Sequence, residues 1–336
     1  MGYIGTVTLY GSLLALGYVF ALFKRGNALL KNGVVLQGIL PALKPLYARA
    51  ALSMILRPKT LPASFLSRPL PSLSITSKGI VADVKTLTAY RKLCGLPDCS
   101  MLPLVYPTVE SFCMNLACMC MPSFPVSVIG GVLCRYTATM YKPIQQSELL
   151  TYRQRLHPMV RQTSKGDTEF DMSVTVLAAS GETLWEDTST FLSFGNQKRA
   201  PRKHGDEGDA QPNWDHYATW QLTTQAGPQF AALNGDINFI HLHPMLARLF
   251  GFKSNIAHGT YLVSKAVAAM QHGAELLYPQ TVSALFKRPA ILPDTFKCSW
   301  QQASLGGSRF TICSSSTGKA AITGEYGHGK AAVAKI

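Results

Sequence analysis

Alternating apolar and polar residues, interrupted by two long apolar stretches, divide most of the chain into two units of one kind. Residues 106–121 are apolar almost throughout, and Pro107 stands near their start, where a helix tolerates proline. This predicted helix must be buried, because it has no polar face to present to water. Strands are predicted after it at residues 147–161, 168–178 and 183–194, joined by tripeptides suited to hairpin turns.

The second unit repeats this order of elements. A strand at residues 216–222 precedes an apolar helix at 259–272. The strands predicted after that helix are at residues 281–287, 294–301, 307–315 and 320–326. A sheet that curls around such a helix can bury it, so the pattern predicts an α+β fold in each unit. The polar interval at residues 196–212 is the clearest boundary between them.

The first part of the chain is predicted to be an apolar, basic leader. Residues 6–23 form an uncharged run long enough to cross a bilayer, and Lys24 and Arg25 follow it directly. These cations favour a membrane anchor that keeps the downstream chain on the cytosolic side. Two alternatives stay open. A cleaved secretory signal is disfavoured because no charge precedes the apolar run, and an organelle import sequence agrees with the absence of acidic residues in the leader.

These patterns predict three regions along the chain. The leader covers residues 1–60, a first folded domain covers 61–200, and a second covers 201–336. The prolines of residues 62–71 are typical of a linker. The expected location is intracellular and membrane-associated through the N-terminal segment, with a mitochondrion or a peroxisome as the candidate organelle.

The charge distribution changes the choice of partners. The net charge is +14, but nine of the 32 basic residues and none of the 18 acidic residues lie within residues 1–82. The folded part therefore lacks a basic patch with interleaved aromatic residues, and we exclude nucleic acid as a partner.

The eight cysteines predict reduced thiols in an intracellular protein, since they cluster in the first half and do not form a framework across a small domain. Cys113, Cys118 and Cys120 are expected to fill a helical core. No Cys-x-x-Cys pair with a nearby histidine offers a tetrahedral metal site, so neither a metal nor another cofactor is expected.

Candidate chemistry is concentrated in two short segments. Residues 230–244 place Asp236 and His241 five positions apart in a turn rich in glycine and asparagine. Residues 256–260 place His258 and Gly259 at the start of the second apolar helix. A carboxylate beside an imidazole fixes its tautomer and raises its basicity, which suits proton transfer next to a carbonyl. Asp-x-Asn alone is common in turns, so the prediction depends on the combination.

The two segments resemble the MaoC-like family of the hot-dog superfold, which includes R-specific enoyl-CoA hydratases and 3-hydroxyacyl-thioester dehydratases. The family pattern, Gly/Ser-Asp-x-Asn-Pro-hydrophobic-His, is present at residues 235–241 with Phe239 in place of the proline, and the downstream His-Gly pair is present at 258–259. A weaker likeness to two-domain members extends over residues 75–330. The resemblance implies a double hot dog, whose first domain lacks the motif and shapes an acyl tunnel.

The resemblance also implies a reaction, the reversible hydration of trans-2-enoyl thioesters to (3R)-3-hydroxyacyl thioesters in fatty acid metabolism. Asp236 and His241 would hold and deprotonate the water, and Asn238 would orient them. The Gly259 N–H, at the positive end of a helix, would stabilise the thioester oxygen. The expected substrate is an acyl-CoA or acyl-carrier-protein thioester, and a homodimer is compatible with the family.

Four further residues are assigned to substrate binding: His258, Lys253, Lys287 and Arg288. The three cations could contact phosphates of the acyl carrier, although solvated surface charge is the alternative. Two other functions stay open as well. One is a non-catalytic acyl-thioester-binding subunit that has lost activity through Phe239, and the other is a hot-dog thioesterase.

Overall fold

The computed structural model describes residues 30–58, 61, 63–127, 131–163, 166–193, 214, 216–273, 275–302 and 307–329. The predicted membrane anchor at residues 6–23 and the polar interval at 196–212 lie outside these residues. Within the ranges described, no helix is both long and apolar enough to span a membrane. Membrane association therefore stays a prediction.

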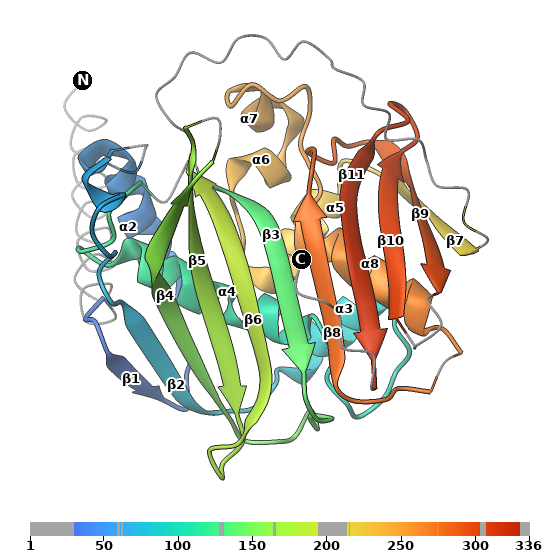
Figure 1. Cartoon of the computed structure of the whole chain (residues 1–336), viewed down its shortest axis with the longest axis horizontal. Helices are drawn as coiled ribbons and strands as arrows, with labels where there is room; N and C mark the ends of the chain where they lie inside the picture. Colours follow the sequence, from blue (N-terminus) through green and yellow to red (C-terminus); the bar gives the residue numbers. More distant parts are fainter. Residues whose placement is uncertain are drawn as a thin grey trace, which may run out of the picture.

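The fold is α+β, as predicted, with helices packed against one eleven-stranded mixed sheet (Figure 1). The strands are β1 (Val34–Gln37), β2 (Ser74–Ile80), β3 (Gly131–Met140), β4 (Leu150–Gln162), β5 (Thr168–Leu177), β6 (Thr183–Ser193), β7 (His216–Leu222), β8 (Gln280–Phe286), β9 (Asp294–Gln302), β10 (Gly307–Ser314) and β11 (Ala320–His328). The helices are α2 (Leu43–Leu56), α3 (Val84–Cys94), α4 (Tyr106–Cys120), α5 (Ala226–Asn234), α6 (Phe239–Leu242), α7 (Pro244–Arg248) and α8 (Gly259–Gln271), with a 3-10 turn at Ala63–Phe65.

The sheet is continuous across the two halves of the chain. Its order is β1-β2-β4-β5-β6-β3-β8-β11-β10-β9-β7, so β3 of the first half pairs with β8 of the second. All neighbours are antiparallel except β1 and β2, which are parallel. In the middle of β5, buried and half-buried residues alternate, which is the period expected of a strand with one face on the core. The helices cover that core face.

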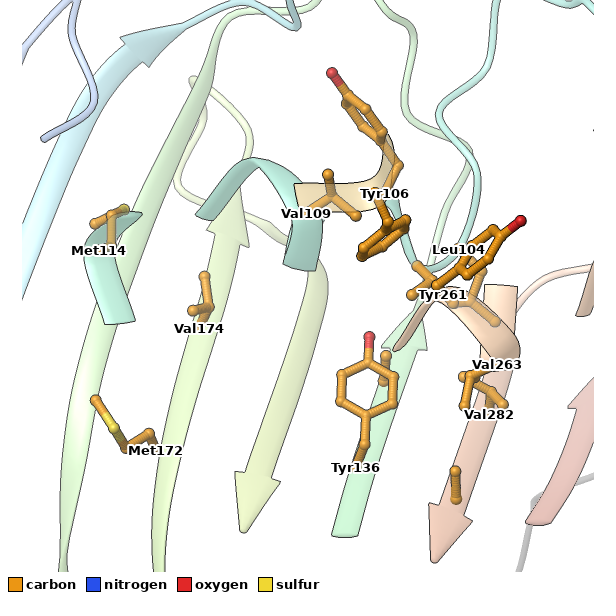
Figure 2. Close-up of a cluster of buried hydrophobic side chains, with 14 of the residues drawn as sticks. Leu104, Tyr106, Val109, Met114, Tyr136, Met172, Val174, Tyr261, Val263 and Val282 are labelled. Atoms are coloured by element: carbon orange, nitrogen blue, oxygen red, sulfur yellow. The ribbon is translucent and has the colours of Figure 1, made fainter. Parts of the chain in front are cut away.

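Two long apolar helices, α4 and α8, form the centre of the core. Almost every residue of α4 is buried, and Pro107 occupies its first turn, as the sequence predicts. Figure 2 shows core side chains from both halves meeting beside the β3–β8 junction, including Tyr136 of β3 and Tyr261 of α8. The Tyr90 hydroxyl of α3 donates to Ser264 Oγ of α8 at 2.8 Å. The halves therefore share one continuous core.

Part of the predicted leader is built into this fold. β1 extends the sheet edge beside β2, and α2 packs with its Leu46 and Ala50 in the core. The proline-rich stretch predicted as a linker is also bound: the Leu70 N–H donates to the Pro158 carbonyl at 2.8 Å. The sequence pattern did not indicate these elements, because their contacts are with residues far along the chain. The eight cysteines are free thiols.

Candidate active site

The turn that carries Asp236 begins where α5 ends. Gly235 caps α5 with φ +77°, a conformation that residues with a side chain rarely adopt. A Cβ at this position would also lie 2.2 Å from Leu43 Cδ1. The Asn234 side chain accepts from the Asp236 N–H at 2.8 Å, and Asp236 Oδ1 accepts from the Asn238 N–H at 3.1 Å. These short-range bonds hold the carboxylate in a fixed turn.

Asn238 caps the short helix α6, which carries His241. Its side-chain oxygen accepts from the Ile240 N–H at 3.5 Å, so Asn238 acts on the backbone of the turn. Phe239 is the first residue of α6 and its side chain is 45% exposed. Asn238 has ψ 128°, the extended conformation that a following proline would also require. The turn thus keeps a proline-compatible geometry without the proline.

The two motif segments are joined by hydrogen bonds around His241. His241 is buried, and its Nδ1 lies 2.9 Å from the Ile256 carbonyl oxygen. The Asn255 amide donates to the carbonyls of His241 at 3.0 Å and Thr224 at 2.8 Å. Gly227 of α5 packs so closely that a Cβ there would lie 2.0 Å from the His241 oxygen. The position of His241 is therefore fixed from three directions.

His258 lies directly against Asp236 and His241. Its ring stacks on that of His241 with centroids 3.7 Å apart, and its Nε2 lies 3.4 Å from the Asp236 carbonyl oxygen and 3.6 Å from Oδ2. Only 4% of His258 is exposed. Burial, followed by the nearby His241, lowers the pKa of His258 well below its usual range, so the ring is neutral near pH 7. The structure places His258 as a neighbour of the carboxylate, whereas the sequence assigned it to the substrate.

The carbonyl partners fix the proton on each ring. A carbonyl oxygen only accepts, so His241 is protonated at Nδ1 and His258 at Nε2. His241 Nε2 then presents its lone pair toward Asp236 Oδ2 at 3.8 Å, which is too long for a direct hydrogen bond. Both atoms are acceptors, so a single water can donate one proton to each. Asp236 is 21% exposed through its side chain, which leaves this position accessible.

Gly259 is the first residue of α8, immediately after His258. Its N–H is one of the donors that have no carbonyl partner within a helix, and it lies at the positive end of the helix dipole. A Cβ at Gly259 would lie 2.4 Å from Phe286 Cε1. The absence of a side chain therefore allows Phe286 of β8 to pack against the start of α8.

The three predicted cations lie at the periphery. Lys253 is exposed on the loop that precedes Asn255. Lys287 is exposed after β8, and the neighbouring Arg288 guanidinium donates to the Ala320 carbonyl at 2.8 Å. Two residues after Arg288, the Ala290 carbonyl accepts a hydrogen bond from the N–H of Ala257, which immediately precedes His258. Lys287 and Arg288 thus stand on a loop bound to the site, and their contact with a substrate stays a prediction.

Asp236, His241 and His258 also form the only group in the described part of the chain whose ligand atoms could surround a metal ion, within 4.8 Å of one another. The hydrogen bonds of the two histidines are poorly compatible with metal binding. A cation on His258 Nε2 would displace the proton to Nδ1, which is buried and has no hydrogen-bond partner among the described residues. The donor set is therefore better suited to holding a water molecule and a proton.

Tyr47 of α2 is a site residue that sequence reasoning missed. Its hydroxyl donates to the Gly235 carbonyl and accepts from the Ile237 N–H at 2.9 Å, on the two sides of Asp236. No local signal marks it, because 188 residues separate Tyr47 from Gly235. Asn255 was missed too, although it stands directly before the second motif segment.

Comparisons with known proteins agree with this geometry. Residues 210–323 match a family model described as a MaoC like domain. The chain is 28% identical over 234 residues to 3-hydroxyacyl-thioester dehydratase X of Mycobacterium tuberculosis, covering 67% of this chain and 79% of that protein. It is 30% identical over 167 residues to peroxisomal multifunctional enzyme type 2 of Drosophila melanogaster, covering 47% of this chain but 27% of that protein.

The fold is likewise similar to solved structures. The crystal structure of HtdX of Mycobacterium tuberculosis superposes with a TM-score of 0.63 at 24% identity, covering 75% of this chain and 98% of that chain. A MaoC-like dehydratase of Phytophthora capsici superposes with a TM-score of 0.60 at 16% identity, covering 80% and 98%. At these identities the likeness shows the fold alone.

Proposed function

This chain belongs to the MaoC-like dehydratase family, and we propose that it interconverts (3R)-3-hydroxyacyl thioesters and trans-2-enoyl thioesters in fatty acid metabolism. The observation that carries the proposal is the pair of acceptors Asp236 Oδ2 and His241 Nε2, which face one another at 3.8 Å. The proposal extends to this chain the activity of the mycobacterial relative, a 3-hydroxyacyl-thioester dehydratase.

In the hydration direction, the acceptor pair first binds the water. One O–H donates to Asp236 and the other to His241, so the water oxygen is oriented and made more nucleophilic. The oxygen attacks C3 of the enoyl thioester while a proton passes to the pair. The His258 Nε2–H lies 3.6 Å from the same oxygen, Asp236 Oδ2, and 3.4 Å from the Asp236 carbonyl oxygen, and it stabilises the position of the carboxylate. Asp236 and His241 are therefore the proposed catalytic groups, and Asn238 and His258 hold them in place.

The electron pair of the C2–C3 double bond moves toward the thioester oxygen as the new C–O bond forms. In this proposal the Gly259 N–H, which lies in the first turn of α8, stabilises the charge on this enolate oxygen. The proton held by the pair is then delivered to C2, so that one water has been added and the pair is regenerated. Dehydration is the same sequence reversed.

The proposal predicts that the full chain consumes crotonyl-CoA and longer enoyl-CoA substrates, followed as the loss of enoyl-thioester absorbance. We expect Asp236→Asn and His241→Ala each to lower turnover by about 10²–10⁴-fold, because an amide at position 236 cannot take up the proton of the water and Ala at position 241 removes the imidazole acceptor. Chiral chromatography of the product should give the 3R enantiomer.

Three other outcomes would contradict the proposal. Unchanged rates in both variants would remove Asp236 and His241 from the reaction. Thermal stabilisation by acyl-CoA without any turnover would indicate a non-catalytic binding subunit. Release of free thiol would indicate a thioesterase.

A further inference from the structure

Helix α2 bridges the end of α4 and the catalytic turn. At its C-terminal end the Arg57 guanidinium donates to the carbonyls of Met119 at 2.7 Å and Met121 at 2.5 Å, where α4 terminates. Closer to its N-terminus, Leu46 is fully buried, and Leu43 occupies the space beside Gly235 that a side chain there would fill. One end of α2 is therefore anchored on the core of the first half, and the other end contacts the turn before Asp236.

Tyr47 makes the polar part of this contact. Its hydroxyl donates to the Gly235 carbonyl and accepts from the Ile237 N–H, so both peptide groups that flank Asp236 are bound to one side chain. Burial raises the pKa of Tyr47 well above its usual range, which keeps the hydroxyl protonated and able to donate. Tyr47 thus restrains the backbone from which the Asp236 carboxylate projects.

The turn gains this restraint from outside in addition to its own hydrogen bonds. Its own sequence has Phe239 where the family pattern has proline, and proline would have stiffened the turn by fixing its own φ and restricting Asn238. The Phe239 side chain does not replace this effect by burial, because it is 45% exposed. The hydrogen bonds within residues 234–238 are short-range and involve only the turn itself.

We propose that Tyr47 is a positioning residue of the dehydratase site, and that α2 supplies from a distance the rigidity that the turn has lost with its proline. The inference depends on the proposed function for its kinetic consequences. Its structural part, the restraint of residues 235–237, can be tested without turnover.

The structural test is amide hydrogen exchange in the full chain carrying Tyr47→Phe. This variant keeps the ring in place and removes only the hydroxyl. We expect the Ile237 amide to exchange severalfold faster, since it loses the Tyr47 hydroxyl and keeps only the Gly235 carbonyl at 3.0 Å as an acceptor, while amides in α8 keep their rates. Tyr141→Phe is the matched control: it removes another tyrosine hydroxyl, one that donates to Glu186 on the exposed part of the first half.

The kinetic test separates positioning from simple stabilisation of the fold. We expect Tyr47→Phe to lower kcat about tenfold on crotonyl-CoA while KM stays within twofold, because a displaced carboxylate impairs the reaction more than binding. Adding Phe239→Pro to this variant should recover most of the lost kcat, whereas adding it to the unmodified chain should change kcat less than twofold. Tyr141→Phe should match the unmodified chain.

Two results would overturn the inference. One is an Ile237 exchange rate that Tyr47→Phe leaves unchanged. The other is a kcat loss that the proline does not recover and that accompanies a general rise in exchange over α2, α4 and α8, which would mean that Tyr47 stabilises the whole fold. If the unmodified chain shows no turnover, the proposed function fails, and the exchange experiment still decides the role of Tyr47.

Discussion

The two halves of the molecule each pack one long apolar helix on strands, yet among the described residues only the second brings one acid together with two histidines. In the first half the most deeply buried acid is Asp187, which is 2% exposed and accepts from the Val174 N–H at 2.9 Å and from Thr108 Oγ1 at 3.0 Å. In the second half Asp236 keeps 21% of its side chain exposed and faces His241 and His258. An acid can serve catalysis when it stays accessible to solvent and can exchange a proton with a neighbouring group. A fully buried acid whose oxygens are bound by the fold has a structural role.

The residues that precede α4 and α8 also differ in whether they can take part in proton transfer. Val105 precedes α4 and His258 precedes α8. Burial raises the pKa of Asp187 to about 7, because the ionised form has lost its water; its hydrogen-bond donors Val174 N–H and Thr108 are neutral, and the charge of Glu186 raises the pKa further. The fold alone therefore does not create the site. The histidines added at one helix start and one turn account for the difference.

Among changes that make the second half resemble the first, the largest effect is expected when His258, which precedes α8, is replaced by valine, the residue that precedes α4. His258→Val should lower turnover by about 100-fold, because Asp236 loses its N–H neighbour and His241 loses the ring stacked on it. The variant should remain folded, since a buried neutral ring is replaced by a smaller apolar side chain. Enoyl-CoA hydration and near-ultraviolet circular dichroism measure the two effects. A variant that keeps half of the normal rate would show that His258 is dispensable.

A smaller effect is expected at Gly259. Gly259→Ala would place Cβ 2.4 Å from the Phe286 ring, so the start of α8 must shift and its N–H must move with it. We expect about tenfold slower turnover and a loss of roughly 1–3 kcal/mol in the free energy of unfolding, measured by urea titration.

Gly131→Ala is the control in the first half, because a Cβ there would lie 3.9 Å from its nearest neighbour. Phe286→Leu combined with Gly259→Ala should relieve the contact and recover stability. If the double variant is no more stable than Gly259→Ala, the Phe286 contact is not the cause.

The smallest effect is expected at Asp187 and concerns stability alone. Burial raises the pKa of Asp187 in the folded state to about 7 from the 3.8 of an ordinary Asp side chain, so the folded protein holds a proton that the unfolded chain releases between these pH values. The contribution of Asp187 to the free energy of unfolding is fully present below about pH 4 and is lost as the pH rises to about 7. The side chain introduced by Asp187→Asn does not titrate, so only the unmodified chain loses this stability. The free energy of unfolding of the variant should therefore rise, relative to that of the unmodified chain, by roughly 1–3 kcal/mol between pH 5 and pH 8.

Thermal melting of both proteins at the two pH values measures this difference. Turnover should stay within twofold of normal, because Asp187 is bound within the first half, to Val174 and Thr108. If the difference in melting temperature between the Asp187→Asn variant and the unmodified chain were the same at both pH values, Asp187 would be ionised in the folded protein throughout.

Local sequence was enough to locate the elements that carry their own periodicity. The predicted helices at 106–121 and 259–272 correspond to α4 and α8, and the strands from β4 onward begin within three residues of their predicted starts. Short-range capping likewise placed Asp236 and Asn238 in a turn before α6. These features depend on neighbouring residues, so a pattern in the sequence can reveal them.

Features that depend on distant contacts were not predictable in this way. Residues 30–58 were taken as part of a leader, because they are basic and lack acids, but α2 is held by α4 and by the turn at Gly235. Nothing in the sequence indicates that the His258 ring stacks on His241, and the assignment of His258 to substrate binding stays a prediction. The proton positions on both rings follow only from the carbonyls they meet.

The sequence by itself thus determined which groups are present: an acid, two histidines and a glycine at a helix start, spaced as the turn and α8 require. The tertiary structure decided how they act. Packing of α5, α6 and α8 turned Asp236 Oδ2 and His241 Nε2 toward each other as acceptors, and α2 brought Tyr47 to the backbone on both sides of Asp236. The reason is physical: side-chain identity is local, but proton location and rigidity depend on partners that only folding brings within hydrogen-bonding distance.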